Sequence, residues 1–369
     1  MTAGFVPPPY PHDRLADVVR RAEAHEGGAI DLSIGTPCDP PAADVVAALA
    51  HSDAERGYPP SIGTPAYRAA AAGWLGRRFG IEVDSDQLAA TIGTKEFVAG
   101  LPHWLRLRRP ECDTVLHPAL AYPTYAMGAQ LAGARAVPVA VRPDWSIDVD
   151  SIDPGDVERA LCLWVNTPGN PAGGLDDLER VVAWGRAHDV LVVSDECYIE
   201  FTWQGPARSV LHHAREGVLA VHSLSKRSNL AGTRAGFYAG DPDLVTYLRE
   251  VRKHAGFMVP GPVQAAAVVA FDDDGHVDAQ REIYRERLAV GAELLARAGL
   301  DVELPMGGFY LWAAAPDGDA WALTRRLAEE AGVVVSPGDF YGPVGAGHVR
   351  LAMVQPVARL RLAVDRLGR

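Results

Sequence analysis

Paired cysteines, an excess of positive charge and long apolar runs are all missing from this sequence. The cysteines, Cys38, Cys112, Cys162 and Cys197, are scattered without a Cys-x-x-Cys pair, which favours reduced thiols over disulfides. The net charge of −12 argues against a nucleic-acid-binding surface. No run of about 18 apolar residues could cross a bilayer, and residues 1–11 lack the charged-then-apolar pattern of a signal peptide. We therefore expect a soluble cytoplasmic protein that binds neither nucleic acid nor a membrane.

Complete motifs for a metal ion or a dinucleotide are also missing. Residues 272–275, Asp-Asp-Asp-Gly, resemble the start of a calcium loop, but nothing completes the ligand set. A solvated helix break is the better interpretation. Gly342, Gly345 and Gly347 lie in an expected loop and do not follow a strand-to-helix phosphate pattern. We expect no metal site.

The length and the hydrophobic pattern predict a large α/β protein. The chain has 369 residues, of which 48% are hydrophobic, enough for a large core and more than one domain. Strand-like and helix-like runs alternate, which favours a mainly parallel sheet with helices on both faces. We expect an N-terminal segment (1–40) that packs on a smaller domain, a large domain (41–260) and a smaller C-terminal α+β domain (261–369).

The expected elements follow from the apolar periodicity and the turn residues. The expected strands cover residues 30–34, 88–92, 114–117, 134–141, 161–165, 190–194, 218–221, 235–239, 308–314, 333–336 and 348–354. The expected helices cover residues 13–25, 40–51, 65–79, 93–107, 122–132, 175–188, 243–254, 277–298, 321–331 and 357–367.

Residues 221–236 combine the end of an apolar strand with a lysine, two hydroxyls and an arginine. Lys226 follows Ser223 and Ser225, and Arg234 comes eight residues later. A desolvated lysine can lose its proton and bond covalently to a carbonyl. Serine hydroxyls and an arginine fork are suited to a phosphate dianion. A molecule with both groups, such as pyridoxal 5′-phosphate, fits this set. An ordinary lysine in a surface loop explains Ser-Leu-Ser-Lys alone equally well.

The same residues resemble the Ser-x-Ser-Lys-x-x-x-x-x-Gly-x-Arg-x-Gly signature of the fold-type I aminotransferases of classes I and II. This resemblance implies the fold-type I architecture, in which the large domain binds pyridoxal 5′-phosphate. It also implies small amino acid and oxo acid substrates. Lys226 would carry the cofactor and, once released, act as the general base that moves a proton from the substrate Cα.

Two further stretches match what a pyridine ring needs. Asp195 ends a buried strand, where open α/β sheets place ligands, and its charge would keep a ring nitrogen protonated. A helix N-cap is the alternative for Asp195. The resemblance makes Tyr198 and Asn170 hydroxyl and amide donors to the phenolic oxygen of the cofactor. Ala172 replaces the threonine of the family's Asn-Pro-Thr-Gly turn, and Asn-Pro pairs also mark plain turns.

The stretch Thr-Ile-Gly-Thr-Lys-Glu (residues 91–96) runs from a strand into a helix, whose first N–H groups form an anion site. By resemblance, Gly93, Thr94 and Lys95 bind the cofactor phosphate together with the serines and arginine named above. Tyr122 would stack on the pyridine ring, or else be a core tyrosine. Tyr58 corresponds to a tyrosine that reaches the phosphate of the neighbouring subunit, which implies a homodimer with shared active sites.

Arg350 is a lone arginine among apolar neighbours in an expected strand, and a buried arginine needs an anion. By resemblance, it binds the substrate α-carboxylate, which Gly35 and Asn170 also approach. An intramolecular salt bridge is the alternative.

A closer resemblance is to the actinobacterial N-succinyldiaminopimelate aminotransferases. Residues 92–96, 251–256, 259–264 and 336–343 carry it. The implied reaction exchanges an amino group between N-succinyl-LL-2,6-diaminopimelate and 2-oxoglutarate in lysine biosynthesis. The distal carboxylates then need a cation, and Lys95 is the preferred candidate, although it could equally be a solvated helix residue. The other candidates are Arg227, Arg252, Lys253 and His254.

Three alternative functions remain open. A general aspartate or aromatic aminotransferase would use the same chemistry with another side-chain pocket. A pyridoxal-phosphate-dependent C–S lyase would eliminate rather than transaminate. A transcription regulator with an aminotransferase-like sensor would need a DNA-binding domain before the strand at Ile30, where we expect none.

Overall fold

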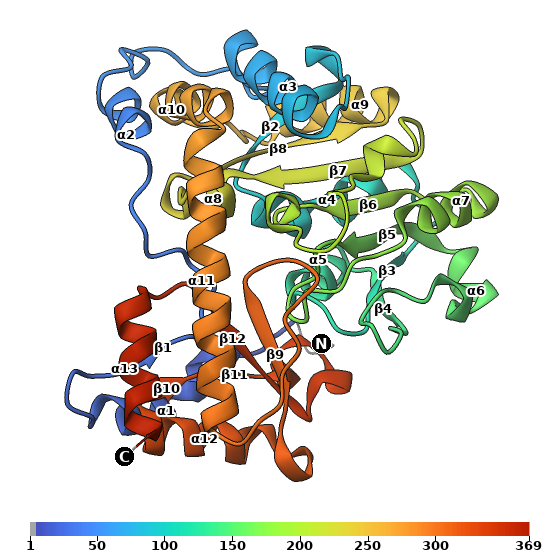
Figure 1. Cartoon of the computed structure of the whole chain (residues 1–369). Helices are drawn as coiled ribbons and strands as arrows, with labels where there is room; N and C mark the ends of the chain where they lie inside the picture. The colour runs from blue at the N-terminus through green and yellow to red at the C-terminus, as the bar shows by residue number, and fades with distance from the viewer. Residues whose placement is uncertain (1–4, 369) are drawn as a thin grey trace. The chain divides into compact units, whose positions relative to one another are not determined.

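The structure, a computed structural model, describes residues 5–368, which divide into two compact units (Figure 1). The larger unit comprises Thr36–Arg285 and Pro305–Phe309. The smaller unit comprises the chain up to Gly35, residues 286–304, and the chain from Tyr310 onward. The chain therefore passes from the smaller to the larger unit after Gly35 and returns to the smaller unit after Arg285. The sequence predicted these boundaries near residues 40 and 260. The domain boundaries stay a prediction.

A sheet of seven strands forms the centre of the larger unit, in the order β2-β8-β7-β6-β5-β3-β4 (Figure 1). β8 pairs antiparallel with both of its neighbours, and the remaining pairs are parallel. The predicted, mainly parallel α/β sheet is confirmed. The strands are β2 Leu88–Ile92, β3 Thr114–Pro118, β4 Arg135–Val139, β5 Ala160–Asn166, β6 Val192–Asp195, β7 Val218–Ser223 and β8 Ala235–Gly240.

Both faces of this sheet are buried, because side chains on a strand alternate between faces. Ala220 and Phe237 belong to one apolar core, and the adjacent Val221 and Tyr238 belong to the other. The helices that contribute to the first core are α2 Ala43–Ala50, α3 Pro65–Phe79, α7 Leu178–His188 and α10 Gly261–Asp272. Those of the second are α4 Lys95–Arg108, α5 Thr124–Leu131 and α9 Pro242–His254. The short helices α6 Pro154–Val157 and α8 Leu224–Arg227 complete this unit.

The smaller unit has the α+β character predicted for the C-terminal region. An antiparallel sheet has the order β11-β12-β9, and β1 pairs in parallel with β10. The strands are β1 Ile30–Asp31, β9 Tyr310–Ala314, β10 Val333–Val334, β11 Ser336–Pro337 and β12 His348–Ala352. The helices are α1 Ala16–Glu23, α12 Ala320–Ala331 and α13 Val357–Leu367, and α11 Gly275–Arg297 contains the change of unit.

Two elements differ from those expected. The first expected helix begins as a 3-10 turn, Pro11–Leu15, before it continues as α1. The helix α10 was not predicted from the sequence. It carries small apolar residues on most sides and so lacks the polar stripe that marks an amphipathic helix. Among residues 5–368, none of the helices combines the length and hydropathy that a membrane span needs.

Candidate active site

The ends of three neighbouring strands bring polar side chains to one edge of the sheet. β5, β6 and β7 run parallel, and they end at Asn166, Asp195 and Ser223. Parallel strands present their carboxyl ends at the same edge, which is where open α/β sheets bind ligands. The predicted location of the site therefore follows from the topology.

Asp195 is buried and held in one orientation from both sides. Its Oδ2 accepts a hydrogen bond from the hydroxyl of Tyr125 at 2.9 Å, and its Oδ1 accepts one from the backbone N–H of Cys197 at 3.2 Å. Burial raises the pKa of this carboxyl, because desolvation disfavours the charged form. A cationic group placed against the carboxylate would therefore be strongly favoured. The alternative role of a helix N-cap is not seen, because the next helical turn, Ile199–Phe201, has Tyr198 at its N-cap position.

Lys226 and Tyr198 approach the same phenylalanine. The amine of Lys226 lies 6.0 Å from the centroid of the Phe309 ring, and the ring of Tyr198 lies 5.5 Å from it. Lys226 is half-buried in α8, the single turn that follows β7. Ser223 caps this turn by accepting a hydrogen bond from the backbone N–H of Ser225 at 3.0 Å.

The predicted phosphate-binding residues form one cluster. Gly93 has φ +63°, and a Cβ there would collide with the guanidinium of Arg234. Glycine is therefore required both by the backbone conformation and by the close approach of the arginine. Nη1 of Arg234 donates to the backbone carbonyl of Ala231 at 2.9 Å and lies 3.5 Å from Oγ of Ser225. Ser223 and Ser225 share a hydrogen bond of 2.9 Å between their hydroxyls.

Cys197 connects this cluster to Asp195. Its Sγ lies 3.5 Å from Oγ1 of Thr94, the residue that precedes α4. Burial raises the pKa of the Cys197 thiol well above its ordinary value, with the charge of Asp195 adding to the effect and that of Lys226 opposing it. The thiol is therefore protonated and serves as a neutral link between the two ends of the site.

Tyr122 and Asn170 complete the group. The ring of Tyr122 lies edge-on to that of Tyr125, with 5.9 Å between the centroids. Burial raises the pKa of Tyr122, and the charges of Asp195 and Arg234 act on it in opposite directions. Asn170 is buried, and its backbone N–H donates to Oδ1 of Asn166 at 2.8 Å. Asn166 in turn donates to the backbone carbonyl of Asp195 at 2.8 Å.

An ion pair below the turn explains why residues 91–96 keep their shape. Glu96 accepts the backbone N–H of Ile92 at 2.9 Å and two hydrogen bonds from Arg252, at 2.7 and 2.8 Å. The guanidinium of Arg252 is buried among aromatic rings, those of Phe97, Trp104, Tyr238 and Phe257. Arg252 therefore supports the turn. Because its guanidinium already binds Glu96, it is less suited to binding a substrate carboxylate.

Two predicted site residues of the larger unit lie at its surface. Lys95, the first residue of α4, has an exposed side chain directly after the Gly93-Thr94 turn. Tyr58 is 98% exposed in the loop before α3.

Arg350 and Gly35 both lie in the smaller unit, next to the same tyrosine. The guanidinium carbon of Arg350 lies 4.4 Å from the ring centroid of Tyr310 and 4.9 Å from that of Tyr341. Nη2 of Arg350 donates to the backbone carbonyl of Ser33. A Cβ at Gly35 would collide with the hydroxyl of Tyr310, so the absence of a side chain permits this approach. The strand β12 places Arg350 in the interior, as predicted.

Several residues of the site were not identified from the sequence. Tyr125 is the most important, because it orients Asp195, and it stands only three residues after Tyr122 in Ala-Tyr-Pro-Thr-Tyr. Asn166 begins the same Asn-Thr-Pro-Gly-Asn-Pro stretch that contains Asn170. Phe309 gave no signal, since it lies in an expected strand.

These side chains fit pyridoxal 5′-phosphate. Arg234, the serine hydroxyls and the first N–H groups of α4 suit a phosphate dianion. Asp195, at the other end, is a desolvated carboxylate suited to a protonated ring nitrogen. Tyr122 supplies an aromatic face near Asp195 and Arg234, and Lys226 supplies the amine.

Comparisons with known proteins agree with this fit. Residues 28–367 match the family model of aminotransferase class I and II. A probable aminotransferase of Mycobacterium tuberculosis, Rv1178, is 45% identical, covering 98% of this chain and 85% of that protein. The 4-dedimethylamino-4-oxo-anhydrotetracycline transaminase OxyQ of Streptomyces rimosus is 43% identical over 98% and 99% of the two chains. The structure of a probable N-succinyldiaminopimelate aminotransferase from Thermus thermophilus has a TM-score of 0.86 and 32% identity over 96% and 98%.

Proposed function

Because the chain belongs to the class I and II aminotransferases and so uses pyridoxal 5′-phosphate, we propose that its substrate is N-succinyl-LL-2,6-diaminopimelate. The amino group would be exchanged with 2-oxoglutarate. The succinyl substrate carries three carboxylates and glutamate carries two, so the pocket needs a cation beyond the one that binds the α-carboxylate. The proposal is also supported by the likeness to the Thermus thermophilus structure.

The observation that carries the proposal is the place of Lys95. Its side chain is exposed at the first turn of α4, directly after the turn that lies against Arg234. The ammonium group of Lys95 at this position would contact a distal carboxylate of a long substrate without being buried. A site that uses a cation to bind the distal carboxylate also discriminates against side chains that lack this group.

The other candidate cations have less suitable surroundings. Arg227 is 2% exposed and donates to the backbone carbonyl of Ala270 at 2.7 Å. Arg252 is equally buried and is held by Glu96. Lys253 is exposed and pairs with Glu250 at 2.9 Å on the same helix. Lys95 therefore remains the preferred residue.

The protein residues have distinct roles in the proposed mechanism. When bound, the cofactor supplies a ring that withdraws electrons from the Cα–H bond of the amino acid. Asp195 would keep the ring nitrogen protonated, and Lys226 would take the Cα proton and return it to C4′ of the cofactor. Tyr198 and Asn170 would donate to the phenolic oxygen. Arg350 would bind the α-carboxylate in a bidentate fashion.

We also propose a cytoplasmic homodimer in which Tyr58 reaches the phosphate site of the partner subunit. The support is the exposure of Tyr58 together with the family resemblance of its Gly-Tyr-Pro-Pro loop. Sedimentation of the active enzyme at assay concentration tests this proposal. An active monomer would contradict it.

A second candidate is the amination of a polycyclic ketone, because the likeness to OxyQ extends over almost the whole of both chains. That reaction would use the same Lys226 and Asp195 with a wide apolar pocket. A general aspartate or aromatic aminotransferase and a C–S lyase are further alternatives.

A half-reaction screen tests the proposed function. The purified enzyme with its cofactor is mixed with single amino donors while the cofactor absorbance is followed. The donors are N-succinyl-LL-diaminopimelate, unsuccinylated LL-diaminopimelate, glutamate, aspartate, phenylalanine and a cysteine thioether. We expect fast conversion of the succinyl donor and of glutamate. Equal conversion of phenylalanine would favour a general enzyme, and release of pyruvate from the thioether would favour a lyase. Fast conversion of glutamate with slow conversion of N-succinyl-LL-diaminopimelate would favour the ketone-aminating function, because that reaction also needs an amino donor.

A further inference from the structure

Lys226 is carried by a helix too short to hold its own direction. α8 comprises only Leu224–Arg227, and a single turn has no stability in isolation. The direction of the Lys226 side chain must therefore be set by the contacts of its neighbours in the turn. The most buried polar neighbour is Arg227, the next residue along the chain, which is 2% exposed.

Hydrogen bonds from one nitrogen and two aromatic rings hold the guanidinium of Arg227. Nη1 donates to the backbone carbonyl of Ala270 at 2.7 Å. The guanidinium carbon lies 5.1 Å from the Trp74 ring centroid and 5.5 Å from that of Phe271, within the range of cation–π attraction. Because successive helical residues point about 100° apart, anchoring Arg227 restricts the direction in which the Cα–Cβ bond of Lys226 leaves the turn.

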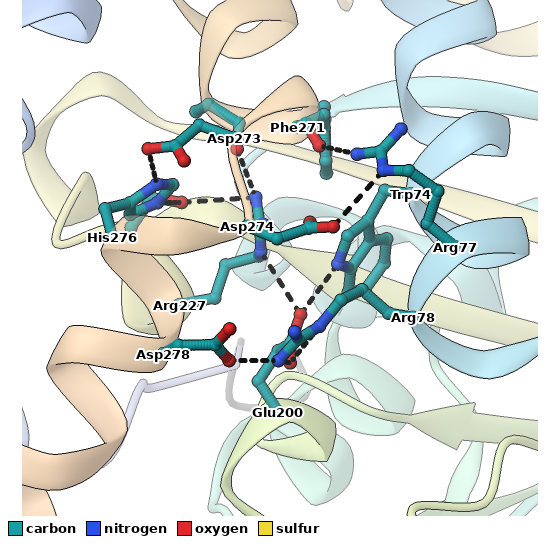
Figure 2. A network of polar contacts seen from close by, with 12 residues as sticks. Trp74, Arg77, Arg78, Glu200, Arg227, Phe271, Asp273, Asp274, His276 and Asp278 are labelled. Carbon is teal, nitrogen blue, oxygen red and sulfur yellow. Dashed lines mark hydrogen bonds and ion pairs between the residues drawn. The ribbon is translucent and has the colours of Figure 1, made fainter.

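Glu200 is the carboxylate that faces Arg227 (Figure 2). Its Oε1 lies 3.7 Å from Nε of Arg227 and accepts the indole N–H of Trp74 at 2.7 Å. Its Oε2 accepts two hydrogen bonds from Arg78, at 2.9 and 3.2 Å. Burial lowers the pKa of Arg227 to about 10, so the guanidinium is still charged at neutral pH. The pair is therefore a buried ion pair in which Glu200 is well supplied with hydrogen-bond donors, whereas Nε and Nη2 of Arg227 make no hydrogen bond within residues 5–368 and Glu200 supplies the charge that faces them.

Glu200 and Arg227 each lie within two residues of a side chain of the candidate site. Glu200 lies in the 3-10 turn Ile199–Phe201, two residues after Tyr198. Arg227 lies one residue after Lys226. Tyr198 and Lys226 both approach the ring of Phe309. The ion pair thus joins the two segments that carry these groups.

We propose that Arg227 and Glu200 are a positioning pair, which sets the approach of the Lys226 amine relative to the Tyr198 hydroxyl. The inference rests on the base role proposed for Lys226 and is independent of the substrate. A small displacement of a proton-transferring group lowers the rate strongly while leaving binding intact. The competing view is that the network only stabilises the fold, since Arg78 also bridges Glu200 to Asp278 at the start of α11 (Figure 2).

The substitution Arg227→Met removes the ion pair and keeps an apolar side chain of similar length against Trp74 and Phe271. Arg78→Met is the matched control, because it removes the other arginine from the same carboxylate on the α3 side. Arg227→Lys keeps the charge and tests for partial rescue. If Arg227→Met does not fold, Glu200→Gln removes the charge from the other side, with little change in shape.

Three quantities are measured for each variant. They are the single-turnover rate per cofactor-loaded site, the effect of Cα-deuteration on that rate, and the melting temperature of the cofactor-free protein. The donor is whichever amino acid the wild type converts fastest in the half-reaction screen. The rate per cofactor-loaded site does not depend on the fraction of folded protein. A loss of stability therefore changes the melting temperature, whereas a displaced Lys226 changes the per-site rate.

We expect Arg227→Met to lower the per-site rate about 10-fold or more, and Cα-deuteration should slow the remaining rate by the full isotope effect. Arg227→Lys should recover part of the rate. Arg78→Met should lower the melting temperature of the cofactor-free protein with a rate within about twofold of wild type. The proposal is overturned if Arg227→Met, or Glu200→Gln in its place, has a wild-type per-site rate, or if both arginine variants lose rate equally. Near-normal turnover by Lys226→Ala would instead refute the base role on which the inference rests.

Discussion

The hydroxyl of Tyr125 donates to Oδ2 of Asp195 at 2.9 Å, and both side chains are buried. The two residues are 70 positions apart, on α5 and at the end of β6. This bond favours the ionised carboxylate, against the effect of burial, which raises the pKa of Asp195. The charge needed beside a pyridine nitrogen thus depends on a tyrosine outside the recognised motif.

We expect Tyr125→Phe to lower kcat about 10-fold, the effect of losing a hydrogen bond to a charged group. Without the donor the pKa of Asp195 rises further, so the acidic limb of the pH–rate profile should move to higher pH. Tyr247→Phe is the control, because that hydroxyl donates to the backbone carbonyl of Trp104 instead. A Tyr125→Phe profile that superimposes on the wild type would contradict this role.

Glu196 and His222 form a buried neutral pair next to the site. Oε2 of Glu196 lies 3.4 Å from Nε2 of His222, and each residue is 1% exposed. Burial raises the pKa of Glu196 from 4.5 to about 7 and lowers that of His222 from 6.5 to about 3. Both directions favour the uncharged forms, so near pH 6 the two groups are neutral neighbours rather than an ion pair, and the facing atoms make no hydrogen bond in the described part of the chain.

The two groups predict opposite effects of pH on stability. Because the folded state holds the Glu196 proton more tightly, its contribution is lost as the pH rises from about 4.5 to about 7. His222 acts at lower pH, where stability is lost as the pH falls from about 6.5 towards 3. Glu196→Gln imitates the protonated acid and removes the first effect.

We therefore expect Glu196→Gln to be more stable than the wild type at pH 8, by up to about 3 kcal/mol, and equal to it below about pH 4.5. Urea unfolding across this pH range measures the difference. Glu216→Gln, at an exposed position, is the control and should show no such dependence. A Glu196→Gln variant that is less stable at every pH would indicate a charged Glu196–His222 pair instead.

The close approach of Arg234 to Gly93 predicts the result of adding a single methyl group. Gly93→Ala brings a Cβ into the guanidinium and places alanine at φ +63°, a strained conformation for an L-residue. We expect the cofactor to bind about 10-fold more weakly or worse, measured by absorbance titration, together with a lower melting temperature.

Gly80→Ala is the matched control for Gly93→Ala. Gly80 ends α3 with φ +69°, and a Cβ there would meet nothing within 4 Å. This variant has the same backbone strain without the collision, so its cofactor affinity should be unchanged. Equal affinity of both variants would show that Arg234 does not need the space that Gly93 leaves.

Lys95→Ala tests the distal end of the substrate. We expect activity with the succinyl substrate to fall by roughly 10-fold or more, on the order of 1.4 kcal/mol, because one carboxylate loses its cation. Lys253→Ala, which removes another exposed lysine, should leave the rate unchanged. An unaltered substrate profile in Lys95→Ala would place the distal contact on another residue.

The parts of the site that could be predicted are those whose signal is local in sequence. Ser223, Ser225, Lys226 and Arg234 stand within one stretch of fixed spacing, and the structure brings the hydroxyls and the guanidinium together. The parallel sheet was equally predictable, because buried strands are continuous apolar runs separated by amphipathic helices.

Contacts between distant segments were not predictable. The partners Tyr125–Asp195, Glu200–Arg227 and Glu96–Arg252 join residues that only the folded sheet and its helices bring together. The helix α10 was missed for a different reason, because a helix that is apolar on most sides has no periodic pattern to detect.

The most direct measurement is borohydride reduction of the purified enzyme with its cofactor, followed by mass spectrometry of the peptides. The lysines of the chain are Lys95, Lys226 and Lys253, so the attachment point can be assigned without ambiguity. We expect the added mass on Lys226, and Lys226→Ala should bind the cofactor without fixation and lose turnover by orders of magnitude. Added mass on Lys95 or Lys253 instead of Lys226, or near-normal turnover by Lys226→Ala, would contradict the assignment of the active site.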